Sequence, residues 1–295
     1  MDKLEPNLLL ASKTKQQIDD FIEHPYHGLL IIGAKGSGKT SILDYLATRL
    51  LNIEPNKLAS YPHLLRLTIE GPTNSIGIDT VHQLDRFFGR VVSQPKNQQN
   101  QITRVVIIDD AEYLSLDAQN ALLKNLEEPP QDSVFLLSST NSTKLLPTLL
   151  SRVRTIRLAN PTQDDITSYL MPLVNNPKVI KQAINMSGGV PGLAIAIALN
   201  QNDHSLIKAS IAAKQILSSD TYAKLLLVNS LAKDPKFVTE VLFLIQQMAR
   251  LGLETAEAKQ STHWQKVLNT AYLTEQQLAQ NTNPKLTLTN MMLHL

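Results

Sequence analysis

Short apolar runs alternate with stretches of helical periodicity through the first half of the chain. Three of these runs are predicted to be buried strands, at residues 29–32, 105–108 and 134–137, and a weaker run at residues 64–69 predicts a fourth. Between them, apolar residues recur every three or four positions, as in the helix predicted around residues 42–50. This alternation is typical of an α/β domain with a largely parallel sheet flanked by helices.

After residue 158 the strand signals stop and helical patterns take over. Three helices are predicted here: one begins at Pro161, a second runs through Ile180 to Gly188, and a third begins at Pro191. From about residue 206 everything is predicted to be helical, including one helix from Asp234 that stops at Gly252 and others over residues 222–231, 263–272, 274–280 and 286–295. We therefore expect three domains, an α/β domain at 1–159, a small helical domain at 160–205 and an all-helical domain at 206–295.

Composition excludes disordered and coiled-coil proteins, proteins that coat polyanions, and all cysteine-based sites. With 43% hydrophobic and 18% charged residues, the chain is an ordinary globular protein and neither a disordered nor a coiled-coil one. Its net charge of +2 is too small for a protein that coats a polyanion, so contact with nucleic acid would need a local patch or an assembly. The absence of cysteine excludes disulfides, thiolate zinc sites, iron–sulfur clusters and cysteine nucleophiles.

No targeting or membrane signal is expected. The longest notable apolar stretch, residues 193–199, is far shorter than the ~20 residues that span a bilayer. The start of the chain carries Asp2 and Glu5 where a signal peptide would be basic. These features favour a cytoplasmic protein that has no contact with membranes, and the polar tract at residues 93–101 predicts an exposed loop.

A phosphate-binding loop is predicted directly after the first strand. Residues 33–40, GAKGSGKT, fit the P-loop pattern and open the next helix, which is the context that this motif needs. Glycines allow backbone amides to wrap phosphate oxygens, Lys39 adds a charge at the terminal phosphates, and the Thr40 hydroxyl can ligate Mg²⁺. The alternative is a glycine turn that only tightens the strand-to-helix connection. The nucleotide-binding candidates are Gly33, Gly36, Ser37, Gly38, Lys39, Thr40 and Asp109.

Two carboxylates follow the second strong strand. Asp109 is the expected magnesium-associated carboxylate, because ligands of open α/β sheets bind at the carboxyl ends of the strands. Asp110 is at the position of a catalytic base that orients the attacking water, but it is one methylene shorter than the glutamate usual there. The alternative for such paired acids is a solvated turn or a helix cap.

The chain resembles the clamp-loader branch of the AAA+ proteins. This resemblance is carried by Asp110-Ala111-Glu112, by AQNALLKNLEEPP at 118–130, by KLLPT at 144–148 and by Ser151-Arg152. Within the branch it is most similar to the delta-prime type of subunit in the bacterial replicative DNA polymerase, through IGID at 76–79, SGGVPGLA at 187–194 and NPKL at 283–286. The resemblance implies an AAA+ domain, a helical lid and a helical collar that holds five subunits in a ring.

The resemblance also implies roles for single residues. Thr140 is at the sensor-1 position, whose polar side chain reaches the terminal phosphate. Arg152 matches the arginine finger, which serves the nucleotide of the neighbouring subunit in trans. Val153 replaces the cysteine usual after this arginine and is expected to be buried. The implied partners are the other loader subunits, the sliding clamp and primer–template DNA.

Departures from the family pattern argue against strong hydrolysis. No sensor-2 arginine is present in the stretch 190–193, and Asp110 replaces the usual glutamate. Residues 52–67 contain no cysteine for the zinc module that members of this family often carry. We expect a subunit that binds ATP and Mg²⁺ with weak or absent hydrolysis and supplies Arg152 during clamp loading. The alternative is an ATP-hydrolysing motor subunit of the gamma/tau type, and a stand-alone small-molecule kinase would not need the Ser151-Arg152 motif.

Overall fold

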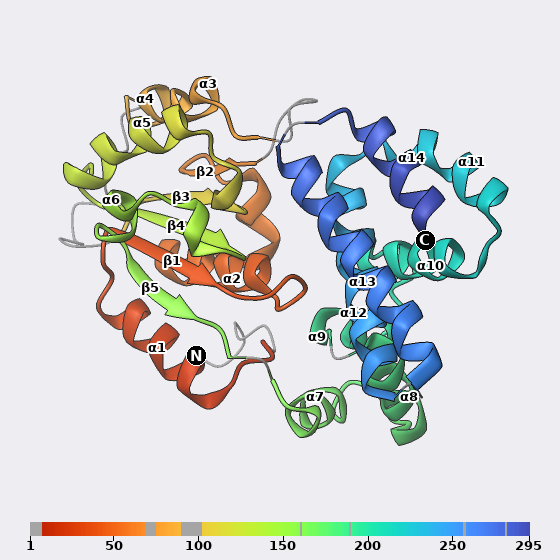
Figure 1. Cartoon of the computed structure of the whole chain (residues 1–295). Coiled ribbons are helices and arrows are strands. Elements are labelled where there is room, and N and C mark those ends of the chain that lie inside the picture. The colour runs from red at the N-terminus through yellow and green to blue at the C-terminus, as the bar shows by residue number, and fades with distance from the viewer. Residues whose placement is uncertain are drawn as a thin grey trace. The chain divides into compact units, whose positions relative to one another are not determined.

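The computed structural model describes residues 8–68, 75–89, 102–159, 161–188, 190–255, 258–280 and 282–295. These residues form two units, residues 1–165 and 166–295, each with its own apolar core. The first unit contains strands and helices, and the second is entirely helical (Figure 1). The predicted division of the helical part at residue 205 stays a prediction, because α9 (Pro191–Ala198) and α10 (Ser205–Ser218) contribute to one shared core.

The first unit is built on a parallel five-stranded sheet with the strand order β2-β3-β4-β1-β5. The strands are β1 (Gly28–Ile32), β2 (Leu64–Leu67), β3 (Arg104–Ile108), β4 (Ser133–Ser139) and β5 (Arg154–Arg157). The helices of this unit are α1 (Ser12–Glu23), α2 (Lys39–Leu51), α3 (Ile78–Val81), α4 (Gln83–Phe88), α5 (Leu116–Glu127) and α6 (Pro147–Leu150), with 3₁₀ turns η1 (Pro55–Ser60), η2 (Ala111–Tyr113) and η3 (Ser142–Lys144).

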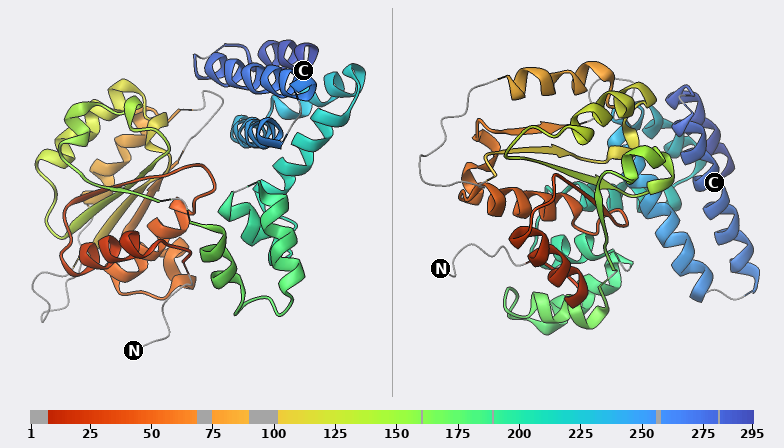
Figure 2. Two further views of the ribbon diagram at one scale, coloured as in Figure 1. Left: turned by 60° about the horizontal axis from the view of Figure 1, so that its bottom comes forward. Right: turned by 90° about the vertical axis from the view of Figure 1, so that its left-hand side faces the viewer.

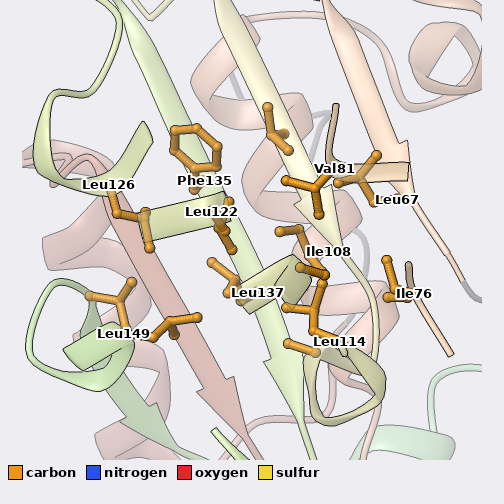
Figure 3. Close-up of a cluster of buried hydrophobic side chains, with 14 of the residues drawn as sticks. Leu67, Ile76, Val81, Ile108, Leu114, Leu122, Leu126, Phe135, Leu137 and Leu149 are labelled. Atoms are coloured by element: carbon orange, nitrogen blue, oxygen red, sulfur yellow. The ribbon is translucent and has the colours of Figure 1, made fainter. Parts of the chain in front are cut away.

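Alternate residues of the central strands enter different cores, because successive side chains of a strand point to opposite faces. In β3, Val106 and Ile108 join the core under α3 to α6, whereas Val105 and Ile107 join the core under α1 and α2. Figure 3 shows the first of these cores, and Figure 2 shows the two groups of helices on opposite faces of the sheet. Burial on both faces explains why these strands are continuous apolar runs.

The sequence analysis missed β5. Its sequence is Arg-Thr-Ile-Arg, in which only Ile156 is buried. An edge strand with one buried position carries no apolar run, so its pairing with β1 was not visible in the pattern. The predicted strand at residues 64–69 is β2, which ends at Leu67, and Ile69 lies outside the described residues, as do residues 93–101.

The second unit consists of α7 (Gln163–Leu170), which begins just before it, α8 (Pro177–Ser187), α9 (Pro191–Ala198), α10 (Ser205–Ser218), α11 (Thr221–Leu231), α12 (Pro235–Thr255), α13 (Ala258–Ala279) and α14 (Pro284–His294). Asp234 caps α12 as predicted, since its carboxylate accepts the amide hydrogen of Phe237 at 2.9 Å. No helix within the described ranges is long and apolar enough to cross a membrane.

Two expectations for the helical unit were wrong. Gly252 does not stop α12, and a Cβ built there would lie 2.4 Å from the Trp264 ring, so the glycine serves close packing of α12 against α13. Residues 263–272 and 274–280 form the single helix α13 up to Ala279. The Thr274 hydroxyl donates to the Thr270 carbonyl at 2.8 Å, which lets a threonine lie inside this helix.

Candidate nucleotide-binding site

The predicted phosphate loop lies between β1 and α2. Gly36 and Gly38 have φ angles of 73° and 83°, in the left-handed region that glycine enters without a steric cost. Gly38 is also the residue before the first turn of α2, and no side chain caps that turn. Backbone amides at an uncapped helix start, next to left-handed residues, form a concave anion-binding surface. The loop therefore has the backbone geometry that a phosphate group needs.

Gly33 is required by packing rather than by its backbone angles. A Cβ at this position would lie 2.7 Å from Ser37 Oγ and 2.9 Å from Leu158 Cδ1. The Ser37 hydroxyl oxygen is buried and has no hydrogen-bond partner in the structure. An unpartnered buried hydroxyl inside the loop fits a site that a phosphate oxygen completes.

Lys39 is folded back beneath the loop. Its side chain is buried, and Nζ donates hydrogen bonds to the carbonyls of Gly33 at 3.0 Å and Ala34 at 3.1 Å. Burial lowers the pKa of Lys39, while the nearby carboxylates of Asp110, Glu112 and Asp109 act in the opposite direction. In this arrangement the ammonium group tethers the loop and is surrounded by three acids.

Asp110 takes a left-handed backbone conformation, with φ of 50°, directly after β3. Its amide donates to the Ser138 hydroxyl of β4 at 2.9 Å, which joins the carboxyl ends of the two strands. Burial raises the pKa of Asp110, and the charge of Glu112 raises it further. The structure thus places Asp110 beside Lys39, in the region of the phosphate loop.

Thr140, the predicted sensor-1 residue, is held by Glu112. The amide of Thr140 donates to Glu112 Oε1 at 2.9 Å, and its hydroxyl donates to the same oxygen. Glu112 is buried within η2, and its second oxygen, Oε2, has no hydrogen-bond partner in the structure. The sequence analysis quoted Glu112 as part of a motif but gave it no role. Its signal was an acid three residues after Asp109, at the carboxyl end of β3.

Asp109, the predicted magnesium carboxylate, is paired with an arginine that the sequence analysis missed. Arg66 Nη1 donates to Asp109 Oδ2 at 2.6 Å, and Arg66 Nη2 pairs with Asp44 of α2. In the parallel register Arg66 lies opposite Ile107, whose side chain enters the core under α2. Asp109 is two residues after Ile107, so Arg66, Ile107 and Asp109 share the face of the sheet that α2 covers. The only signal in the sequence was one charged residue inside the strand Leu-Leu-Arg-Leu.

Arg152 lies at the amino ends of the parallel strands, here called the amino edge of the sheet, whereas the phosphate loop lies at their carboxyl ends, the carboxyl edge. Arg152 precedes β5, and its carbonyl is 3.0 Å from His27 Nε2 at the start of β1, whereas the phosphate loop follows the end of β1. A five-residue strand spans roughly 15 Å, so this arginine is remote from the phosphate loop of its own chain. The Arg152 guanidinium pairs with Glu127 at 2.6 Å and donates to the Thr148 carbonyl at 2.8 Å.

Val153 is buried beside the start of β1, as the sequence analysis expected. A Cβ built at Gly28 would lie 2.9 Å from Val153 Cγ1. This close approach ties the segment after Arg152 to the first strand. The backbone next to Arg152 is therefore fixed by packing, although the arginine side chain itself is partly exposed.

A pocket of about 620 Å³ lies next to the phosphate loop rather than in it. Ile32, which precedes the loop, and Leu158, which packs against Gly33, both line it. The remaining walls come from α1, η3, α6, β5 and the segment after β5, and they are Lys13, Thr14, Gln17, Ser142, Leu150, Thr155, Arg157 and Ala159. Room for a small organic group is therefore present beside the predicted phosphate site.

The parallel sheet, the glycine loop after β1 and the acids after β3 define a P-loop protein of the AAA+ type. The family model described as "DNA polymerase III, delta subunit" matches residues 13–162, and the chain belongs to this family. It is a member of the clamp-loader family of DNA polymerase III.

Named relatives include two kinds of subunit. The chain is 30% identical over 224 residues to DNA polymerase III subunit delta' of Escherichia coli (strain K12), which covers 69% of this chain and 64% of that protein. It is 26% identical over 262 residues to DNA polymerase III subunit gamma of Buchnera aphidicola subsp. Schizaphis graminum, covering 82% and 68% of the two chains. The match therefore spans slightly less than two thirds of the delta' relative.

A solved structure supports the fold. The DNA polymerase III gamma subunit-related protein of Thermotoga maritima superposes with a TM-score of 0.55 and 20% identity, covering 95% of this chain and 97% of that one. At this identity the likeness concerns the fold alone.

Proposed function

We propose that this chain is a clamp-loader subunit of the delta-prime type, which completes the loader ring and supplies Arg152 to the nucleotide of a neighbouring subunit. The observation that carries this proposal is the placement of Arg152 at the amino edge of the sheet, remote from the phosphate loop of its own chain. A guanidinium supplied in trans stabilises the charge of a transferring phosphoryl group. The assembled ring would then load the sliding clamp onto primed DNA in an ATP-dependent reaction.

In this proposal the chain binds ATP but hydrolyses it slowly. The left-handed glycines, the uncapped start of α2 and the unpartnered Ser37 hydroxyl support phosphate binding, and the neighbouring pocket has room for the rest of a nucleotide. Slow hydrolysis is supported by the first turn of α9, which begins at Pro191 and contains no arginine. It is also supported by Asp110 in place of glutamate.

A motor subunit of the gamma/tau type is the second candidate. The backbone geometry of the phosphate loop favours it, because Gly36 and Gly38 take the left-handed conformation that wrapping a phosphate requires. In that case this chain would hydrolyse ATP itself, and Lys39 would be essential to the reaction.

One experiment separates the two candidates. The chain is mixed with the other loader subunits and the clamp of the same organism, and the clamp-stimulated ATPase is measured for Arg152→Ala and Lys39→Ala. Arg154→Ala is the matched control, since this neighbouring arginine is also paired with one exposed acid, Asp20. The delta-prime proposal expects a large loss only for Arg152→Ala. A loss for Lys39→Ala with none for Arg152→Ala would establish the motor instead.

A further inference from the structure

Arg66 of β2 sits between two carboxylates next to the phosphate loop. Its two terminal nitrogens contact different acids, Asp109 after β3 and Asp44 on α2. The Asp109 side chain is 14% exposed and that of Arg66 is 29% exposed, so this contact is largely shielded from water. A planar guanidinium that bridges two acids is held in one orientation and forms strong charge-assisted hydrogen bonds.

Asp109 is also the carboxylate that the sequence predicts for Mg²⁺, because it follows a strand at the same edge of the sheet as the phosphate loop. The Arg66 guanidinium already lies 2.6 Å from Asp109 Oδ2, and a divalent cation at that oxygen would face a like charge at close range. As it stands, the acidic half of this site does not fit a divalent cation.

We propose that Arg66 takes the place of the divalent cation at Asp109, so that nucleotide binding by this chain does not depend on Mg²⁺. The inference rests on the proposed binding of nucleotide at the phosphate loop. The charges near the loop support it. Asp44 and Asp109 contact Arg66, Asp110 and Glu112 lie near Lys39, and Lys35 also acts on Asp110, so four acids face three bases. Removing Arg66 would leave an excess of negative charge that attracts a divalent cation.

The inference distinguishes Arg66 from a purely structural ion pair. A structural pair only stabilises the fold, whereas an arginine that replaces a cation also makes nucleotide binding by the wild type independent of Mg²⁺. An arginine that replaces a cation predicts that Arg66→Met opens a binding site for a divalent ion at Asp109. Methionine keeps most of the apolar stem of the side chain and removes only the charge. Arg104→Met on the neighbouring strand is the control, because the Arg104 guanidinium lies 5.9 Å from the Phe88 ring centroid rather than at the loop.

The first test needs no nucleotide. Thermal unfolding of the full chain is followed with and without Mn²⁺, for the wild type, Arg66→Met, Arg66→Met/Asp109→Asn and Arg104→Met. The expected result is an upward shift of Tm on addition of Mn²⁺ for Arg66→Met alone. A Mn²⁺-dependent shift of similar size in the wild type, or none in Arg66→Met, would overturn the inference. If Arg66→Met does not fold, Arg66→Gln is used in its place.

The second test measures binding of a fluorescent ADP analogue in Mg²⁺ and in EDTA. The Kd of the wild type is expected to be the same in both, whereas Arg66→Met is expected to bind about tenfold more tightly with Mg²⁺. A wild-type Kd that requires Mg²⁺ would overturn the inference. Absence of binding under both conditions would instead contradict the proposed nucleotide site, and the Mn²⁺ experiment would still decide the role of Arg66.

Discussion

Lys39 and Arg66 at the carboxyl edge of the parallel sheet are less exposed than Arg152 at its amino edge. At the carboxyl edge, Lys39 donates to loop carbonyls, Arg66 contacts two acids and Thr140 donates to Glu112. At the amino edge, Arg152 pairs with Glu127, whose side chain is 51% exposed. An exposed ion pair contributes only about 0–1 kcal/mol, whereas breaking a buried one is costly. Arg152 at the amino edge can therefore be redirected to a partner, whereas the paired side chains at the carboxyl edge are held within their own chain.

The largest expected effect is at the carboxyl edge, with Gly33→Ala. The new Cβ would lie under 3.0 Å from both Ser37 Oγ and Leu158 Cδ1 and 3.1 Å from Leu158 Cβ, so both side chains must move. We expect a loss of about 2–3 kcal/mol in the free energy of unfolding, measured by urea denaturation. Gly77→Ala is the control, since nothing lies within 4 Å of its added Cβ and its φ is −77°. Equal stabilities of the two variants would show that the loop is not tightly packed.

Thr140→Val tests the second contact of the carboxyl edge. The variant keeps the shape of the side chain and removes the hydroxyl that donates to Glu112 Oε1. We expect a loss of about 1–2 kcal/mol, as for a hydrogen bond to a charged group in a partly buried site. Thr143→Val provides the comparison, because its hydroxyl bonds to Asn141 in an exposed turn. A smaller loss for Thr140→Val than for Thr143→Val would show that the contact with Glu112 does not hold Thr140 in place.

Asp110→Asn is expected to stabilise the protein. Burial, and then the charge of Glu112, raise the pKa of Asp110 above 3.8, so the folded protein holds this proton to a higher pH than the unfolded chain. Stability is therefore lost as the pH rises from 3.8 through the raised pKa. The variant avoids this loss and should be more stable by about 1 kcal/mol at pH 7, a gain that disappears below pH 3.8.

Unfolding in urea at a series of pH values measures this gain. Asp132→Asn is the matched control, because Asp132 has a similar left-handed backbone, with φ of 60°, but lies at the amino end of β4. A pH-independent gain in Asp110→Asn, or an equal gain in Asp132→Asn, would show that the buried charge is not its cause.

The smallest effect on stability is expected at the amino edge. Glu127→Gln removes the exposed partner of Arg152 and should change the free energy of unfolding by less than about 1 kcal/mol. In the reconstituted loader, its ATPase should equal or exceed that of the wild type, because Arg152 is released for the neighbouring subunit. Glu128→Gln, one residue further on, is the control. A large loss of stability would mean that the two edges do not differ as described.

Much of the site could be predicted from local patterns. Strands β1, β3 and β4 appear as apolar runs because both their faces are buried. The phosphate loop could be recognised because glycines at fixed spacing are needed for its backbone angles. Strand β5 could not be predicted, because an edge strand with one buried residue carries little signal. Gly252 was misinterpreted for a similar reason, since its close contact with Trp264 depends on the neighbouring helix.

The sequence by itself determined the fold class, the phosphate loop and the acids Asp109 and Asp110, because these depend on short-range periodicity and spacing. The burial of Val153 was implied by the resemblance to clamp-loader proteins. Only the tertiary structure decided which groups these residues meet. Arg66 reaches Asp109 across 43 positions of the chain, and Glu112 reaches Thr140 across 28. Such contacts arise from the parallel register of the strands, which brings residues far apart in sequence to one edge of the sheet.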